Sequence, residues 1–245
     1  MQTILISLMG EELPEDIKVV KGDGQQMEIT EYKSRAEQQE DWAPGWEAID
    51  VVFDQLYDNQ KPAHYGTELH KRAMLGGDQY LDGFSIYESC NGYKHILTYG
   101  MSELYVNEEA FGGEWSGWGY EMTFKLQAES AEECLWACDM LANLARYTYT
   151  QQRFFEPLQF VAGNGTSIHY GVESDITALL VVNDTEAKGI DSVHGRVEFL
   201  QVVGITEREL ELLKEDFTLA EKFVEEMKKD NPYLVTDMGR KKSYL

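Results

Sequence analysis

The chain has 245 residues, of which 43% are hydrophobic, so it can bury a sizeable core as one domain or a closely joined pair. It carries 44 acidic and 21 basic residues, and the net charge of -23 lies mainly in the middle of the sequence rather than in a tail. A folded body this negative repels phosphate backbones, which argues against direct binding of nucleic acid. The same charge serves either solubility or the attraction of basic proteins and cations.

The cysteines and the first residues bear on the cellular compartment. Cys90, Cys134 and Cys138 cannot all pair within the chain, and the last two are four residues apart on one helix face, where disulfide geometry is poor. The opening MQTILISLMG has no preceding basic residue and is followed by two glutamates, which fits neither a secretory signal nor a membrane span. These features predict a reduced, soluble, cytoplasmic protein that does not bind membranes.

The N-terminal region predicts an appendage followed by a helix. Apolar residues alternate with polar ones over 4–8, and the Gly-Asp-Gly sequence at 22–24 predicts a turn, so we expect a hairpin or added edge strands within 1–33. Residues 34–41 are acidic and rich in glutamine, which indicates a linker or an exposed helix. Apolar residues then recur every three or four positions over 46–57, which predicts a helix.

The remaining sequence mixes strands and helices without regular alternation. Two S/T-x-x-E capping boxes, at Ser130 with Glu133 and at Thr206 with Glu209, predict the starts of two helices. Apolar runs and period-two patterns predict strands at 84–87, 95–99, 120–126, 159–162, 176–182, 196–203 and 234–236. We therefore predict an α+β fold with a mixed, largely antiparallel sheet packed with helices.

The segment 95–126 has an unusual composition. In its second strand Glu121, Thr123 and Lys125 alternate with apolar residues, which predicts a strand with one buried face and one solvated face. The loop 106–119 combines glycines and glutamates with three large rings, Phe111, Trp115 and Trp118. Such rings are either packed down or serve as contact anchors for a partner.

No motif assigns reaction chemistry to the chain. It has no Walker-type phosphate loop, no dinucleotide-binding fingerprint after a strand and no nucleophile elbow. None of the histidines shows the spacing of a metal pair: His64, His70, His95, His169 and His194. The 44 carboxylates leave a paired acid–base site open as an alternative, but no pair is marked out. We assign no catalytic residue, metal site or cofactor.

Several blocks of sequence resemble the Suppressor of fused family in the family's order. They are GWEAID (45–50), LGGDQYLDGFSIY (75–87), YGMSELY (99–105), SGWGYEMTFKL (116–126), LANLARY (141–147), GRVEFLQVVGITERELE (195–211) and LVTDMGRKKS (234–243). Each block is weak alone, and together they are specific. The resemblance implies a Suppressor of fused-like domain over residues 45–245, while residues 1–44 form an unmatched N-terminal extension.

The resemblance also implies a function. The domain is expected to be equivalent to the N-terminal lobe of the eukaryotic protein, which holds Gli transcription factors inactive by gripping a short extended peptide between two lobes. This chain stops where the second lobe would begin, so the full clamp is not expected here. The single-lobe form resembles the bacterial branch, which implies an immunity protein of a polymorphic toxin system that neutralises a toxin by binding it.

The resemblance places a protein-binding surface on the segment 95–126. Tyr105 closes YGMSELY and matches a family tyrosine at the peptide-contacting surface, and Glu114 is the nearest counterpart of the family's loop acid. Glu103 and Trp115 are further residues of the expected protein-binding surface. Asp82 either caps its own turn or joins the binding surface. An exposed strand edge near Tyr105 is expected to add a strand of the partner.

Our leading hypothesis is a non-enzymatic domain that sequesters a protein partner, a basic toxin domain being the best match to the acidic body. One alternative is a metal-assisted hydrolase that uses clustered carboxylates. Another is an accessory scaffolding module in which residues 1–44 dock elsewhere or mediate self-association.

Overall fold

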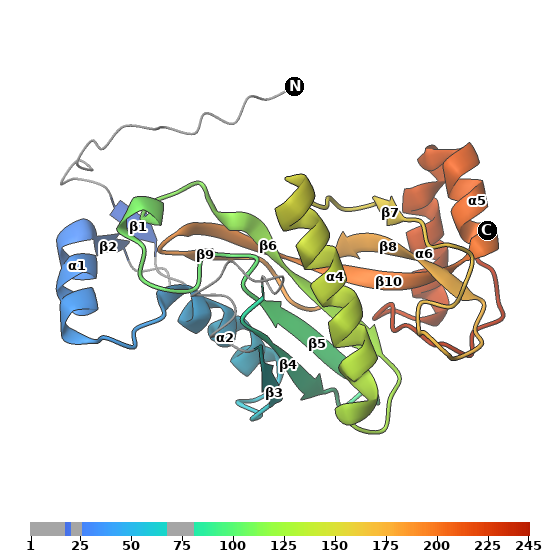
Figure 1. Cartoon of the computed structure of the whole chain (residues 1–245), viewed down its shortest axis with the longest axis horizontal. Helices are drawn as coiled ribbons and strands as arrows, with labels where there is room; N and C mark the ends of the chain where they lie inside the picture. Colours follow the sequence, from blue (N-terminus) through green and yellow to red (C-terminus); the bar gives the residue numbers. More distant parts are fainter. Residues whose placement is uncertain (1–17, 21–25, 68–80) are drawn as a thin grey trace.

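The computed structural model describes residues 18–20, 26–67 and 81–245, and it is built around an eight-stranded sheet (Figure 1). The strand order is β3-β4-β5-β6-β10-β8-β7, and β9 pairs with β10. Strands β6 and β10 are parallel, while the other described pairs are antiparallel. The strands are β3 (Ala63–Gly66), β4 (Gly83–Glu88), β5 (Lys94–Tyr99), β6 (Trp115–Leu126), β7 (Phe160–Val161), β8 (Ile176–Asn183), β9 (Ile190–Ser192) and β10 (Gly195–Thr206). The predicted mixed, largely antiparallel α+β fold is confirmed.

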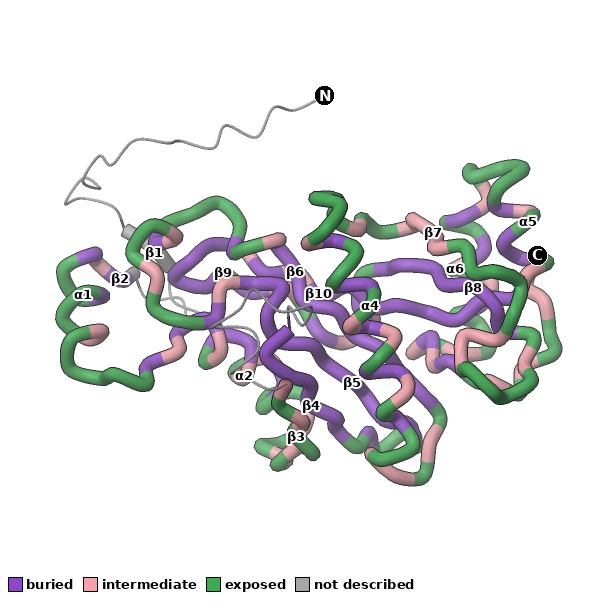
Figure 2. The backbone as a smooth tube through the Cα atoms, in the orientation of Figure 1, coloured by how far each residue is buried: buried purple, intermediate pink, exposed green. Residues whose placement is uncertain are grey.

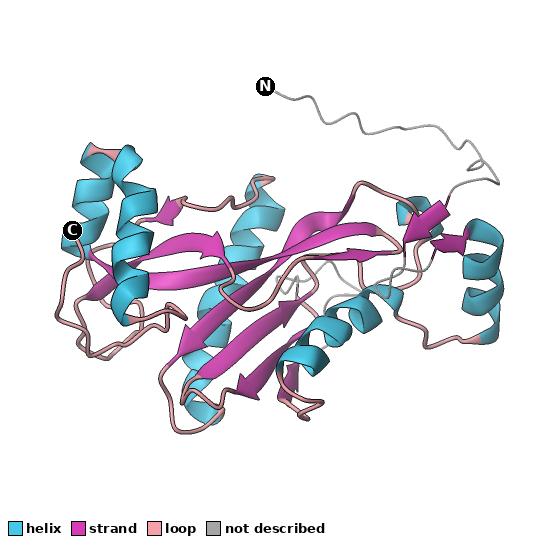
Figure 3. Cartoon of the chain, turned by 180° about the vertical axis from the view of Figure 1, so that it is seen from behind, coloured by secondary structure: helices cyan, strands magenta, loops and turns pink. Residues whose placement is uncertain are grey.

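Helices cover both faces of this sheet, as the view from behind shows (Figure 3). The α-helices are α1 (Ile29–Gln38), α2 (Pro44–Leu56), α4 (Leu135–Gln151), α5 (Glu207–Glu215) and α6 (Ala220–Asp230). Short 3-10 helices are η1 (Glu108–Ala110), η2 (Glu132–Cys134) and η3 (Phe217–Leu219). Helix α4 packs on one face, whereas α2 packs on the opposite face together with α5 and α6. None of the described helices is long and apolar enough to span a membrane.

The alternation of β10 explains this arrangement. Leu200 and Val202 point into the cluster with α4, while Phe199 points into the cluster with α2 and Val203 into the cluster with α5 and α6. Successive side chains of a strand point to opposite faces, so a strand covered on both faces needs apolar residues at nearly every position. The run from 199 to 205 meets this need except at Gln201.

The prediction of a half-solvated strand at 120–126 is wrong. Glu121, Thr123 and Lys125 alternate with the apolar residues, but each is 0% exposed. The tube of β6 is coloured as buried along most of its length (Figure 2). On this side of the strand the Asp184 carboxylate bonds Thr123, Lys125 and His95. Glu121 bonds Thr98 and the loop residues Gly100 and Ser102 instead. This face is therefore a buried polar layer, in which every charge has a partner from another element.

Most element predictions agree with the structure, with local differences. The Thr206 box is complete, since its hydroxyl accepts from the Glu209 N–H and the Glu209 side chain accepts from the Thr206 N–H. The Ser130 box is half formed: its hydroxyl accepts from the Glu133 N–H at 3.4 Å, but the Glu133 carboxylate accepts from the N–H of Glu129 rather than that of Ser130. Helix α4 begins at Leu135 after a 3-10 turn. Strands β3 and β9 were not predicted from the sequence.

The N-terminal region forms a small unit on the main body. Strands β1 (Lys18–Val20) and β2 (Gln26–Glu28) pair as an antiparallel hairpin, and α1 follows directly. This pairing agrees with the hairpin expected within 1–33, whereas the apolar residues 4–8 and the Gly-Asp-Gly sequence at 22–24 lie outside the described residues. The region expected as a linker or exposed helix is mostly helical, within α1.

Candidate protein-binding surface

The connection between β5 and β6 forms an exposed loop surface beside α1 (Figure 1). Tyr105 is 45% exposed and Trp115, at the start of β6, is 52% exposed. Glu114 is exposed and Glu103 is half-buried. We refer to Glu103, Tyr105, Glu114 and Trp115 as the Tyr105 surface. Tyr105 lies in the connection rather than on a strand, so the expected free strand edge is not found at this residue.

Backbone contacts hold the two parts of the Tyr105 surface together. The N–H of Glu103 donates to Ser116 Oγ at 2.9 Å, and the N–H of Trp118 donates to the Met101 carbonyl at 2.8 Å. Gly117 has a φ of +56°, and a Cβ there would lie 2.6 Å from the Met101 carbonyl oxygen. Only glycine allows this close approach without strain, and the approach seats the loop against the start of β6.

Helix α2 contacts the same loop at Leu104 and Glu103. The N–H groups of Gly45 and Trp46 both point to the carbonyl of Leu104, at 3.0 and 3.4 Å. N–H groups in the first turn of a helix have no acceptor within the helix. The Leu104 carbonyl supplies the acceptor for these two. A Cβ on Gly45 would lie 1.9 Å from the Glu103 carbonyl oxygen, which leaves no room for a larger residue.

A buried carboxylate fixes the start of the loop. Glu121 is 0% exposed and one of its oxygens accepts from the N–H groups of Gly100 and Ser102 at 2.9 and 3.0 Å and from the Ser102 hydroxyl at 2.7 Å. The other oxygen accepts from the Thr98 hydroxyl at 2.7 Å and the Met101 N–H at 3.3 Å. Burial raises the pKa of Glu121, and these hydrogen bonds oppose that shift. Glu121 was missed from the sequence because its alternating position predicted a solvated side chain.

The other rings of the loop are packed down. Phe111 is 3% exposed and lies in a cluster with Tyr32 and Trp42. Trp118 is half-buried against the α4 core and meets Tyr149 edge to face at 5.6 Å. Of the three rings noted in the loop sequence, only Trp115 is therefore exposed for contact with a partner.

Asp82 lies apart from the Tyr105 surface. It is 5% exposed, its N–H donates to the Tyr99 carbonyl at 2.7 Å, and its carbonyl accepts from the Thr67 N–H at 2.8 Å. These contacts place it at the start of β4, between the chain ends of β3 and β5. A side chain this buried does not reach a partner, so we remove Asp82 from the predicted binding set.

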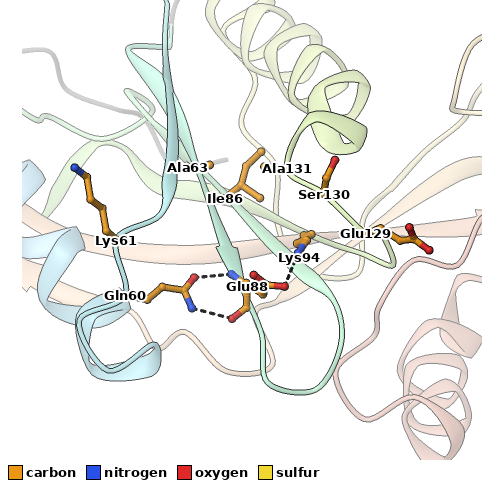
Figure 4. Close-up of a pocket in the computed structure, with 9 residues that line it drawn as sticks. All are labelled: Gln60, Lys61, Ala63, Ile86, Glu88, Lys94, Glu129, Ser130 and Ala131. Carbon is orange, nitrogen blue, oxygen red and sulfur yellow. Dashed lines mark hydrogen bonds and ion pairs between the residues drawn. The ribbon is translucent and has the colours of Figure 1, made fainter.

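Two surface cavities bear on the hydrolase alternative. The first, of about 420 Å³, lies between the ends of β4 and β5 and the segment before α4, where Gln60 bonds the Glu88 backbone and Lys94 bonds the Glu88 carboxylate at 2.8 Å (Figure 4). The second, of about 620 Å³, lies between the end of α4 and β7 and is lined in part by aromatic residues such as Tyr147 and Phe154. Within residues 18–20, 26–67 and 81–245, no group of three His, Cys, Asp or Glu residues could hold a metal ion. The hydrolase alternative gains no support from this part of the chain.

The Tyr105 surface lies inside a segment with clear relatives. Residues 77–241 match the sequence profile of the family described as Suppressor of fused protein (SUFU). The chain belongs to the Suppressor of fused family. It is 30% identical over 182 residues to the human and mouse Suppressor of fused homologues, and the match covers 68% of this chain. That match spans 36% of the length of either relative.

Solved structures agree with this assignment. A chain of the Sufu–Fu complex aligns with a TM-score of 0.70 and 27% identity, covering 82% of this chain and 93% of that one. Drosophila Suppressor of Fused aligns with a TM-score of 0.69 and 27% identity over 82% of this chain and 51% of its own. A homologue from Neisseria gonorrhoeae, 16% identical with a TM-score of 0.55, shares the fold over 82% of this chain and 97% of its own. The Sufu–Fu complex shows that a relative binds a protein partner.

Proposed function

We propose that this chain is a non-enzymatic binding protein that sequesters a protein partner through the Tyr105 surface. The observation that carries the proposal is the pairing of two exposed rings, Tyr105 and Trp115, on a loop that buried hydrogen bonds hold in one conformation. Exposed aromatic side chains on a fixed backbone lose little entropy on binding, which makes them effective anchors.

We further propose that the partner is a basic toxin domain, which the chain neutralises as an immunity protein in the cytoplasm. Two observations support this choice of partner. The chain has a net charge of -23, and Glu103 and Glu114 flank the two rings of the Tyr105 surface. A negative surface raises the rate of association with a positive partner and disfavours acidic competitors.

A photo-crosslinking experiment tests this proposal. Replacement of Tyr105 by p-benzoylphenylalanine should give, in cells of the source organism, a covalent adduct with one protein, to be identified by mass spectrometry. The matched control places the same group at Tyr147, which is similarly exposed at 42% but lies on α4. An adduct at 105 but not at 147, with a basic toxin domain encoded next to this gene, supports the proposal. Equal adducts at both positions, or none at 105, contradict it.

A further inference from the structure

The part of the chain before the matched family segment contributes a side chain to the support of the Tyr105 surface. Tyr32, on α1, is 0% exposed. Its ring lies 4.8 Å from that of Phe111, which belongs to the partner-facing loop, and 5.1 Å from that of Trp42. Tyr32 lies outside the residues 77–241 that match the family profile.

The hydroxyl of Tyr32 is bonded to the loop and to a buried histidine. It accepts from the N–H of Asn107 at 2.7 Å, and it lies 2.8 Å from Nε2 of His194. The other ring nitrogen of His194, Nδ1, lies 3.1 Å from the carbonyl oxygen of Glu103. The hydroxyl and the imidazole therefore connect Asn107 with Glu103, two residues on either side of Tyr105.

The chemistry of these groups sets the direction of the hydrogen bonds. A carbonyl oxygen only accepts, so Nδ1 of His194 carries a proton and donates to Glu103. His194 is 0% exposed, and burial lowers its pKa, which favours the neutral ring; Nε2 then accepts from the Tyr32 hydroxyl. The result is one continuous chain of donors and acceptors, from Asn107 through Tyr32 and His194 to Glu103. Tyr32 and His194 each have a partner on both sides.

We propose that Tyr32 and His194 are positioning residues that hold the loop segment 103–107, and with it Tyr105, in its binding conformation. The N-terminal extension is then a working part of the partner-binding surface rather than a separate scaffolding module. This inference rests on the proposed function for its biological meaning, because it assumes that Tyr105 meets the partner. The positioning itself can be measured on the isolated protein without any partner.

Hydrogen exchange of the full chain tests the positioning. Tyr32→Phe removes only the hydroxyl, so the Asn107 amide should exchange roughly tenfold faster, which corresponds to one lost hydrogen bond of a buried donor. The matched control is Tyr120→Phe, since that hydroxyl is also buried and also lies near a backbone N–H, that of Phe155 at 3.4 Å. Exchange in the core of β10 reports whether either variant has lost global stability.

A second variant covers the case in which Tyr32→Phe disturbs α1 as a whole. His194→Phe keeps a ring in place but removes both of its hydrogen bonds, so exchange should again rise over 103–107 and not in β10. The inference is supported if both variants loosen 103–107 while Tyr120→Phe does not. It is overturned if 103–107 exchanges at the wild-type rate in Tyr32→Phe or His194→Phe, or if Tyr120→Phe loosens it equally. The crosslinking result at Tyr105 decides the proposed function separately.

Discussion

The Lys125 ammonium nitrogen lies 3.1 Å from a carboxylate oxygen of Asp184, and both side chains are completely buried. Lys125 also contacts the Glu186 carboxylate at 2.7 Å and the Thr185 hydroxyl at 2.6 Å. Burial alone would raise the pKa of Asp184, but His95 and Lys125 beside it hold that pKa well below its usual range. The pair joins β6 to the chain that follows β8.

Removal of this ammonium group should destabilise the fold strongly. Lys125→Met leaves the Asp184 carboxylate buried with less compensation, so we expect the free energy of unfolding to fall by about 3–5 kcal/mol. Lys214→Met is the matched control, because Lys214 pairs with Glu211 at 2.8 Å on the surface, and it should cost about 0.5 kcal/mol or less. Urea denaturation measures both. Equal losses for the two variants would show that burial of the pair does not matter.

The wrong prediction that one face of β6 is solvated has a clear physical origin. The alternation over 120–126 correctly separates two faces, but alternation alone does not report what covers the polar face. Thr123 and Lys125 both bond the Asp184 carboxylate, which lies 61 and 59 residues further along the chain and had no visible connection to β6. The apolar run at 176–182, by contrast, correctly predicted a strand, and an apolar composition on both of its faces fits the burial of nearly all of β8.

At the Tyr105 surface, too, the sequence predicted exposed residues but not the contacts between distant parts of the chain. Tyr105 and Trp115 were chosen from a family resemblance and from composition, and both are exposed. Tyr32, Glu121 and His194 support the loop through contacts that join distant parts of the chain, such as the 162 residues between Tyr32 and His194. A single sequence gives no pattern for such contacts.

The buried carboxylate of Glu121 should be essential for order at the start of the loop. Glu121→Gln places an NH₂ donor where only donors approach, so we expect a loss of about 2–3 kcal/mol and faster amide exchange over 100–102. Glu114→Gln makes the same chemical change on an exposed residue of the same loop, and its stability should stay within about 0.5 kcal/mol of the wild type. Thermal melts with hydrogen exchange measure both effects. Wild-type exchange over 100–102 in Glu121→Gln would refute the role of this carboxylate.

Asp50 on α2 predicts a pH-dependent stability. Burial raises its pKa from 3.8 to about 6, although the Tyr99 hydroxyl, which donates to it at 3.0 Å, opposes the shift. The pKa of Asp50 is higher in the folded state than in the unfolded state. Its contribution to the free energy of unfolding is therefore fully present below pH 3.8 and is lost as the pH rises through about 6. Above that pH the folded protein holds a partly buried charge.

Asp50→Asn should therefore stabilise the protein at pH 8, by about 1–2 kcal/mol after allowance for partial solvation, and give no gain at pH 4. Asp54→Asn, at an exposed position of the same helix, is the control and should show little change at either pH. Denaturation at the two pH values decides the point. A gain that is independent of pH would mean that the charge of Asp50 is not its cause.

Association with the proposed basic partner should depend strongly on salt. With a net charge of -23, the on-rate measured by stopped-flow fluorescence should fall by about an order of magnitude between 0.05 and 0.5 M NaCl. The off-rate should change much less, because the anchoring rings are uncharged. An on-rate that is insensitive to salt would argue against a basic partner while leaving the location of the binding surface open to its own test.

The most direct measurement is the affinity of the crosslinked partner, once purified, for wild-type protein and for Tyr105→Ala. Titration calorimetry should show binding at least tenfold weaker for Tyr105→Ala, as expected for the loss of an aromatic anchor. Thermal stability should be unchanged, because Tyr105 is 45% exposed. Tyr147→Ala, which truncates a comparably exposed tyrosine on α4, should bind like the wild type. Wild-type affinity in Tyr105→Ala, or an equal loss in Tyr147→Ala, would contradict the assignment of partner binding to the Tyr105 surface.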